Sequence, residues 1–100
     1  RWSSYPPHHH PQPEIYHYRF SEEGGYGHGE LGDDVFKIRH RDTLKILDEK
    51  DHAQVSAPGY NMLYVWAIRH LPKNSYTIPE FTESHSWTRF EDANQRVQKL

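Results

Sequence analysis

Hydrophobic and polar residues alternate over several short stretches of this chain, and turn-forming residues separate the stretches. A period of two is typical of β-strands, because successive side chains of a strand point to opposite faces. The stretches with this pattern are residues 14–20, 35–40, 43–47 and 60–69. Short strands at close spacing, with turn signals between them, predict an all-β sandwich or barrel.

The longest apolar segment, residues 60–69, carries apolar side chains on both of its faces. Tyr64 and Trp66 would lie on one face, and Leu63 and Val65 on the other. Strands that are apolar on both faces are typical of sheets covered on both sides. We therefore expect this strand to be packed on both faces.

Residues 21–34 hold five of the six glycines of the chain. Glycine clusters are typical of turns and hairpins, so this segment is predicted to connect two strands. A phosphate-binding loop is excluded, because no Gly-Lys-Ser/Thr sequence follows and no helical pattern begins after the cluster.

The end of the chain has a different pattern. Residues 89–100 contain helix-forming residues with apolar positions at near-helical spacing. These apolar positions are Phe90, Ala93, Val97 and Leu100. They predict a short amphipathic C-terminal helix.

With 100 residues, 34% of them hydrophobic, and a mean hydropathy of -1.05, the chain has the size of one domain but a lean composition for a core. Three Trp, seven Tyr and four Phe bury a large area per residue, which makes an aromatic core feasible. The net charge of -2 gives no electrostatic reason to bind nucleic acid or an anionic membrane. Because there is no cysteine and no apolar run long enough to span a membrane, we expect a cytoplasmic protein.

Three consecutive histidines lie between prolines near the start of the chain. In an extended segment His8 and His10 point the same way, and Glu14 opens the strand that follows. Two imidazoles and a carboxylate on adjacent segments form half of a metal site. The alternative interpretation is a solvated histidine-rich tail. The flanking prolines restrict the backbone and so reduce the entropy lost when the imidazoles are held together.

Three motifs resemble the KduI/IolB uronate isomerase family of the cupin superfamily. They are Trp-Ser-Ser-Tyr-Pro-Pro-His-x-His at 2–10, Glu-Ile-Tyr-x-Tyr-Arg-Phe at 14–20, and His52 with Ala-Pro-Gly-Tyr-Asn-x-Leu-Tyr at 57–64. The family contains 5-deoxy-glucuronate isomerase of inositol catabolism and 5-keto-4-deoxyuronate isomerase of pectin breakdown. The first motif is most similar to the C-terminal cupin domain of the inositol-pathway branch.

The resemblance implies a cupin-type jelly-roll barrel and the interconversion of an aldose-type uronate with its ketose form. The expected substrate is a small sugar acid, a deoxy-uronate such as 5-deoxy-glucuronate. The implied ligands of one divalent transition metal are His8, His10, Glu14 and His52. Zinc is the first expectation, with iron, manganese and nickel as alternatives, because imidazole and carboxylate suit all of these ions.

Family chains contain two cupin domains. Residues 1–100 are therefore expected to be a single cupin domain, a fragment or the C-terminal half of such a chain, with an N-terminal cupin domain or further copies of itself as partners.

One departure from the family concerns the second motif. Where the family has a Pro-x-Gly turn before the histidine, this chain has residues 47–51, so the direction of His52 depends on how this turn folds.

Isomerisation also needs a group that transfers a proton. Binding of the sugar acid needs, in addition, a cation that pairs with the substrate carboxylate. Tyr16 and Tyr18 share the predicted face of Glu14 and are the first candidates for the proton carrier, ahead of His17 and His28. The candidate cations are Arg19, Arg39 and Arg69.

Two other functions fit the same motifs. One is a non-catalytic cupin module that binds a metal or a sugar. The other is a cupin dioxygenase, because an iron site of three histidines and one glutamate also binds oxygen. An isomerase works without oxygen, a dioxygenase requires it, and a module binds metal without turnover.

Overall fold

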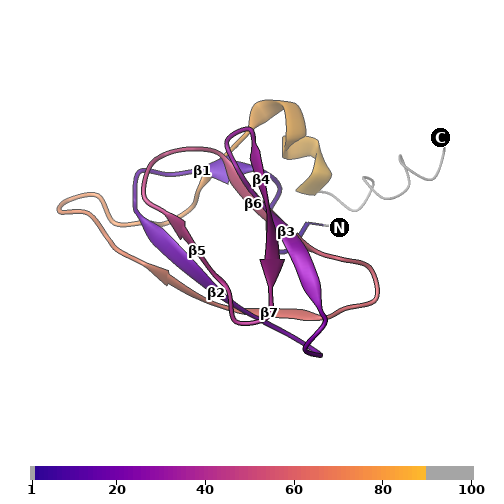
Figure 1. The fold of residues 1–100 in the computed structure, drawn as a ribbon. Coiled ribbons are helices and arrows are strands. Elements are labelled where there is room, and N and C mark those ends of the chain that lie inside the picture. Colours follow the sequence, from indigo (N-terminus) through magenta and orange to yellow (C-terminus); the bar gives the residue numbers. More distant parts are fainter. Residues whose placement is uncertain (1, 90–100) are drawn as a thin grey trace.

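The computed structural model of the protein describes residues 2–89, which form two antiparallel sheets around one core (Figure 1). The strands are β1 (His8–His9), β2 (Glu14–Phe20), β3 (Tyr26–Leu31), β4 (Asp34–Arg39), β5 (Thr43–Ile46), β6 (His52–Ser56), β7 (Met62–Ile68) and β8 (Glu80–Phe81). One sheet has the strand order β4-β3-β6-β1-β8, and the other has the order β5-β2-β7. The predicted all-β, cupin-like fold is confirmed.

Strand β2 is the centre of the three-stranded sheet and supplies much of the core. Its side chains alternate between buried and more exposed positions, as the sequence predicts, and Tyr18 is 0% exposed. Tyr16 lies opposite Leu44 on one side and Trp66 on the other. Its ring meets that of Tyr64 edge to face, with 5.3 Å between the centroids. Such pairs stabilise by about 0.5–1.5 kcal/mol beyond the area they bury, so aromatic packing offsets the lean composition.

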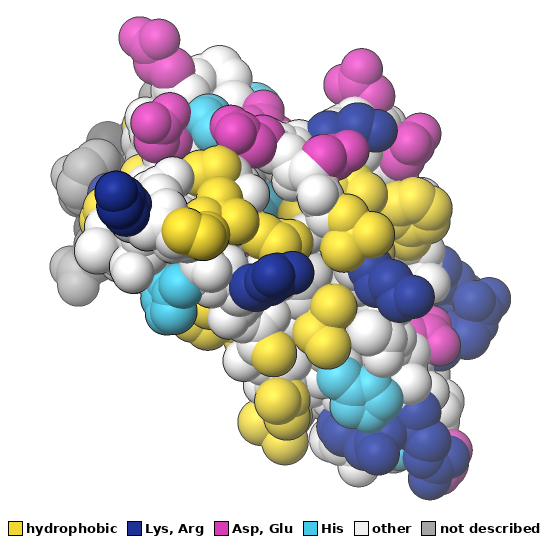
Figure 2. Space-filling model, turned by 90° about the vertical axis from the view of Figure 1, so that its left-hand side faces the viewer, with side chains coloured by type: hydrophobic (Ala, Val, Ile, Leu, Met, Phe, Trp, Pro, Cys, Tyr) yellow, Lys and Arg dark blue, Asp and Glu magenta, His cyan; other side chains and the backbone are white. Residues whose placement is uncertain are grey.

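The prediction that the strand at 60–69 is packed on both faces is wrong. Within the described residues, β7 is an edge strand of its sheet, and its outward side chains Leu63 and Val65 are 67% and 66% exposed. Its inward side chains Met62 and Tyr64 pack against the core. Figure 2 shows apolar side chains open to solvent on this side of the molecule, with acidic groups along the upper edge and basic groups at the lower right. The second apolar face of this strand is therefore a surface.

The glycine-rich segment is only partly a turn, which corrects the sequence prediction. Residues 26–31 form β3, which lies between β4 and β6 in the five-stranded sheet. A Cβ atom at Gly29 would lie 2.7 Å from Cδ1 of Ile38, and one at Gly27 would collide with the carbonyl oxygen of Val55. Here glycine allows close approach inside the sheet, a role that composition alone does not distinguish from turn formation.

The predicted C-terminal helix at 89–100 lies outside the described residues, apart from Arg89. The described residues do contain one short helix, the 3-10 helix η1 (Glu83–Arg89). No helix within residues 2–89 combines the length and the apolar character that crossing a membrane requires.

Candidate metal centre

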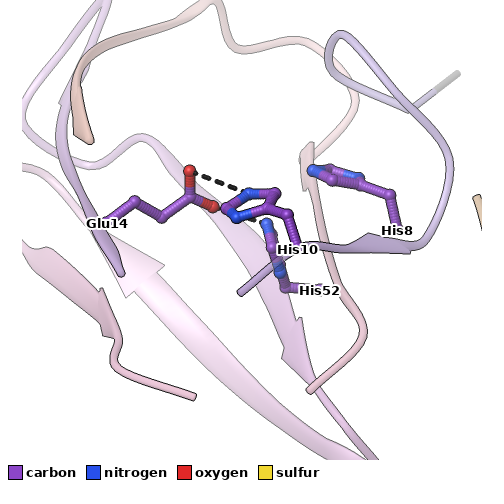
Figure 3. Close-up of side chains that lie close together, drawn as sticks. All are labelled: His8, His10, Glu14 and His52. Atoms are coloured by element: carbon purple, nitrogen blue, oxygen red, sulfur yellow. Dashed lines mark ion pairs between the residues drawn. The ribbon is translucent and has the colours of Figure 1, made fainter. Parts of the chain in front are cut away.

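Two histidines that are distant in sequence lie side by side in the five-stranded sheet. Strand β1 pairs with β6 so that His8 lies opposite His52. Their rings lie 4.2 Å apart between centroids. His10 follows β1, and Glu14 opens β2. The turn at 47–51 therefore directs His52 towards the first motif, and the four predicted ligands converge (Figure 3).

The four side chains form one compact, buried cluster. Each offers a ligand atom, and these atoms all lie within 4.8 Å of one another. Nε2 of His52 lies 2.5 Å from Oε1 of Glu14, and Nε2 of His10 lies 3.3 Å from Oε2. All four residues are buried, with exposures of 6% or less. The solvated-tail interpretation is thereby excluded for His8 and His10.

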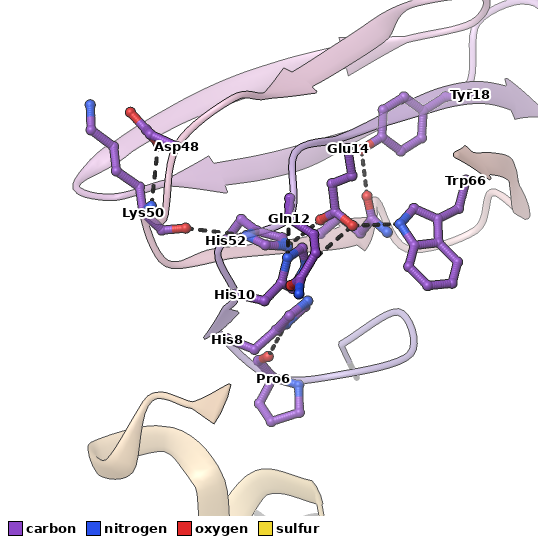
Figure 4. A network of polar contacts seen from close by, with 11 residues as sticks. Pro6, His8, His10, Gln12, Glu14, Tyr18, Asp48, Lys50, His52 and Trp66 are labelled. Atoms are coloured by element: carbon purple, nitrogen blue, oxygen red, sulfur yellow. Dashed lines mark hydrogen bonds and ion pairs between the residues drawn. The ribbon is translucent and has the colours of Figure 1, made fainter. Parts of the chain in front are cut away.

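All three histidines use the same ring nitrogen to contact the backbone. Nδ1 of His8 lies 2.8 Å from the carbonyl oxygen of Pro6, Nδ1 of His10 lies 2.9 Å from that of Gln12, and Nδ1 of His52 lies 3.2 Å from that of Lys50 (Figure 4). A carbonyl accepts only, so each Nδ1 carries the proton. Each Nε2 then keeps its lone pair for a metal, which is the arrangement of metal-binding histidines.

Two buried polar atoms of the cluster lack hydrogen bonds. Oε1 of Glu14 and Nε2 of His52 are close together but make no hydrogen bond of acceptable geometry. Buried polar atoms are normally satisfied, and leaving one unpaired costs about 1–3 kcal/mol. An ion bound between them would satisfy both atoms. The donor set, three imidazoles and one carboxylate, fits a divalent transition metal.

The protonation states at neutral pH also suit a metal. Burial, together with the charge of His52, lowers the pKa of His8 to about 4. Burial alone would raise the pKa of Glu14, but contacts with His52 and Trp66 lower it. A neutral imidazole and an ionised carboxylate are the forms that coordinate metals.

Two aromatic residues that the sequence did not single out as functional complete the site. Nε1 of Trp66 donates a hydrogen bond to Oε2 of Glu14 at 2.5 Å. The ring of Tyr76, in the loop after β7, lies 5.0 Å from the ring of His10 and 5.3 Å from that of Trp66. The sequence predicts that Trp66 shares a face of its strand with Tyr64, but only the register of β7 against β2 brings it to Glu14.

The structure brings Tyr16 to the cluster and leaves Tyr18 deeper in the core. Tyr16 lines a cavity of about 20 Å³ together with His8 and His52. This volume is sufficient for about one water molecule. The hydroxyl of Tyr18 instead donates to the side-chain oxygen of Gln54. Burial raises the pKa of both phenols, so both stay protonated at neutral pH.

The candidate arginines are not brought to the cluster. Arg19 is exposed on the face of β2 opposite to that of Glu14, and Arg39 is exposed at the end of β4. Arg69 is also exposed, at the end of β7. His17 contacts the hydroxyl of Thr43, and its ring does not face the cluster because the odd-numbered residues of β2 point outward. The remaining alternative, His28, is exposed.

Comparison with known proteins agrees with this geometry. The family model described as the KduI/IolB family matches residues 1–88, a stretch that contains all four cluster residues. No curated protein and no solved structure matches the chain. The members of the matched family are isomerases, which supports an isomerase in general. The chain therefore belongs to the KduI/IolB family.

Proposed function

We propose that this chain is a metal-dependent aldose-ketose isomerase domain that acts on a deoxy-uronate, with 5-deoxy-glucuronate of inositol catabolism as the first substrate to test. The observation that carries the proposal is the buried cluster of three histidines and Glu14, whose free ligand atoms face one another in a chain of an isomerase family. A divalent transition metal, first of all zinc, would be held by His8, His10, Glu14 and His52 and would supply Lewis acidity towards the carbonyl and hydroxyl oxygens of the sugar.

Tyr16 would supply the acid part of the proton transfer, and the carbon-bound proton would go to a separate base. The phenol of Tyr16 lies beside the cluster, lines the cavity with His8 and His52, and stays protonated because burial raises its pKa. A protonated phenol can donate to an oxygen on which negative charge develops, which is the acid part of the transfer. Tyr18 supports this arrangement through its hydrogen bond to Gln54, a residue that also lines the cavity.

The size of the cavity defines how a sugar acid would bind. A volume of about 20 Å³ is large enough for a water molecule and too small for a sugar, so the substrate would bind at the mouth of the site. Trp66, which is 42% exposed, lies beside Glu14 and Tyr76 and would border this mouth. The substrate carboxylate would need a cation other than Arg19 or Arg39, because both lie away from the cluster.

The same small cavity favours a second function, a non-catalytic cupin module that binds a metal without turnover. The experiment that separates the two uses the tag-free chain loaded with zinc, manganese, iron or nickel and incubated anaerobically with 5-deoxy-glucuronate or 5-keto-4-deoxyuronate. Nuclear magnetic resonance of the sugar detects the ketose or aldose product.

Conversion without oxygen that disappears in Glu14→Gln supports the isomerase. Bound metal with no conversion of either sugar supports the module and contradicts the isomerase. Consumption of a substrate only when oxygen is admitted would instead indicate a dioxygenase. The matched control is Glu30→Gln, which removes a carboxylate from β3 outside the cluster and should keep the activity of the parent.

A further inference from the structure

The indole of Trp66 makes a directional contact with one oxygen of a metal-ligand carboxylate. Trp66 lies on β7 directly opposite Tyr16 of β2, with its side chain on the inward face of the sheet. From there Nε1 donates to Oε2 of Glu14 at 2.5 Å, as the close view shows (Figure 4). Indole nitrogen is a donor only, so it cannot itself bind a metal and can act only through Glu14.

The two oxygens of Glu14 therefore have different surroundings. Oε2 accepts the hydrogen bond from Trp66 and lies 3.3 Å from Nε2 of His10. Oε1 lies 2.5 Å from Nε2 of His52 and makes no hydrogen bond. One oxygen is thus already engaged by the protein, and the other is free within the cluster.

We infer that Trp66 is a positioning residue that holds the Glu14 carboxylate in one rotation, so that Oε1 is the oxygen presented to the metal. The inference rests on the proposed metal site. A glutamate side chain can rotate about several bonds, and a charge-assisted hydrogen bond of this length restricts that rotation strongly. Loss of a residue that hydrogen-bonds to a metal ligand typically lowers metal affinity 10- to 100-fold.

Trp66 also connects Glu14 to a second ligand through the loop after β7. The ring of Tyr76 meets the indole edge to face at 5.3 Å and meets the ring of His10 edge to face at 5.0 Å. Gln12 binds the same loop, because its side-chain amide donates to the carbonyl oxygen of Asn74 at 2.9 Å. The rings of Trp66 and Tyr76 therefore link Glu14 to His10 at the rim of the site.

The test compares Trp66→Phe with the parent chain. Phenylalanine keeps an aromatic ring for Tyr76 and removes the N–H group. We expect metal affinity, measured by competition with a chelator, to fall 10- to 100-fold, and the visible absorption spectrum of the cobalt(II)-loaded chain to change because the carboxylate is free to rotate. The matched control is Trp87→Phe, the same substitution at a tryptophan of η1 outside the cluster, which should leave affinity and spectrum unchanged.

A second measurement uses the unaltered chain. With tryptophan labelled with ¹⁵N at the indole nitrogen, the N–H of Trp66 should exchange slowly with solvent and shift when metal is added. A parent chain that binds no metal would overturn the proposed site and this inference together. A parent that binds metal, with an unchanged affinity and cobalt spectrum in Trp66→Phe or a rapidly exchanging Trp66 N–H, would overturn this inference alone.

Discussion

His8 and His52 face each other across the antiparallel pair of β1 and β6, with their ring centroids 4.2 Å apart. Strand β1 has only two residues, so it contributes few backbone hydrogen bonds of its own. Backbone hydrogen bonds from Ser3 to Gln54 and from Thr82 to Pro7 also hold the N-terminal segment, and the side-chain contacts of His8 and His10 add to them. A metal bound by these histidines and Glu14 would connect this segment to both sheets at once.

Metal content is expected to depend on residues from both segments. Because His10 and His52 come from different elements of one cluster, His10→Ala and His52→Ala should each lose the roughly one metal ion per chain that elemental analysis should find in the parent. The control is His28→Ala, which removes an exposed histidine outside the cluster and should keep the metal. Retention of the metal in His52→Ala would contradict a site built from two segments.

Removal of the metal should destabilise the fold, because the four ligands converge only in the folded chain. At a free metal concentration of about 100 times Kd, binding adds about 2.7 kcal/mol to the free energy of unfolding. For a domain of this size the Tm should then fall by on the order of 10 °C on chelation, as circular dichroism can measure. In His52→Ala the chelator should have almost no effect. An equal decrease in Tm in parent and variant would show that the chelator acts elsewhere.

The alternation of residues 14–20 is sufficient to predict the inward face of β2, and with it the relation of Glu14 to Tyr16. The same alternation places Arg19 on the outer face, so the sequence already indicates that this side chain points away from the cluster. The chemistry of Arg19 suits a substrate carboxylate, because a guanidinium pairs well with a carboxylate, but its position on the strand does not. Strand periodicity therefore excludes Arg19 from the cluster by the same rule that brings Glu14 and Tyr16 together.

Other features depend on contacts between segments, which a single sequence does not display. The hydrogen bond from Trp66 to Glu14 requires the register of β7 against β2. The edge-to-face contact between Tyr76 and His10 depends on the path of the loop after β7, and the sequence of this loop has no periodic pattern. The assignment of Gly27 to a strand requires the backbone of β6 beside it. The ligand set could be predicted because motif resemblance supplied a long-range relationship that periodicity cannot supply.

The buried phenol of Tyr18 should make the fold sensitive to alkaline pH. Burial, with smaller contributions from Tyr64 and Glu14, raises the pKa of Tyr18 above its ordinary value of 10.0. The folded chain then binds more protons than the unfolded chain above pH 10, so the free energy of unfolding should decrease as the pH rises beyond that value. Denaturant unfolding at several pH values, combined with the ultraviolet absorbance of tyrosinate, measures this dependence.

The variant Tyr18→Phe provides the corresponding comparison. At neutral pH it should lose about 1–3 kcal/mol of stability, because the buried side-chain oxygen of Gln54 is left without its donor. Above pH 10 its stability should decrease less steeply than that of the parent, since one raised pKa has been removed. Parallel pH dependences in parent and variant would show that Tyr18 does not contribute to the alkaline transition.

The outer face of β7 is expected to mediate self-association. Leu63 and Val65 are 67% and 66% exposed on an edge strand, where unpaired backbone groups and apolar side chains favour pairing with another copy. Light scattering at micromolar concentration should therefore give a mass above the 11.9 kDa of one chain, and Val65→Lys should shift it towards the monomer because a charge on an edge strand opposes pairing. Val35→Lys changes a residue that is 61% exposed on β4, one of the two edge strands of the other sheet, and should leave the mass unchanged. A monomeric parent would contradict self-association, whereas a decrease in mass only with Val35→Lys would assign the contact to β4.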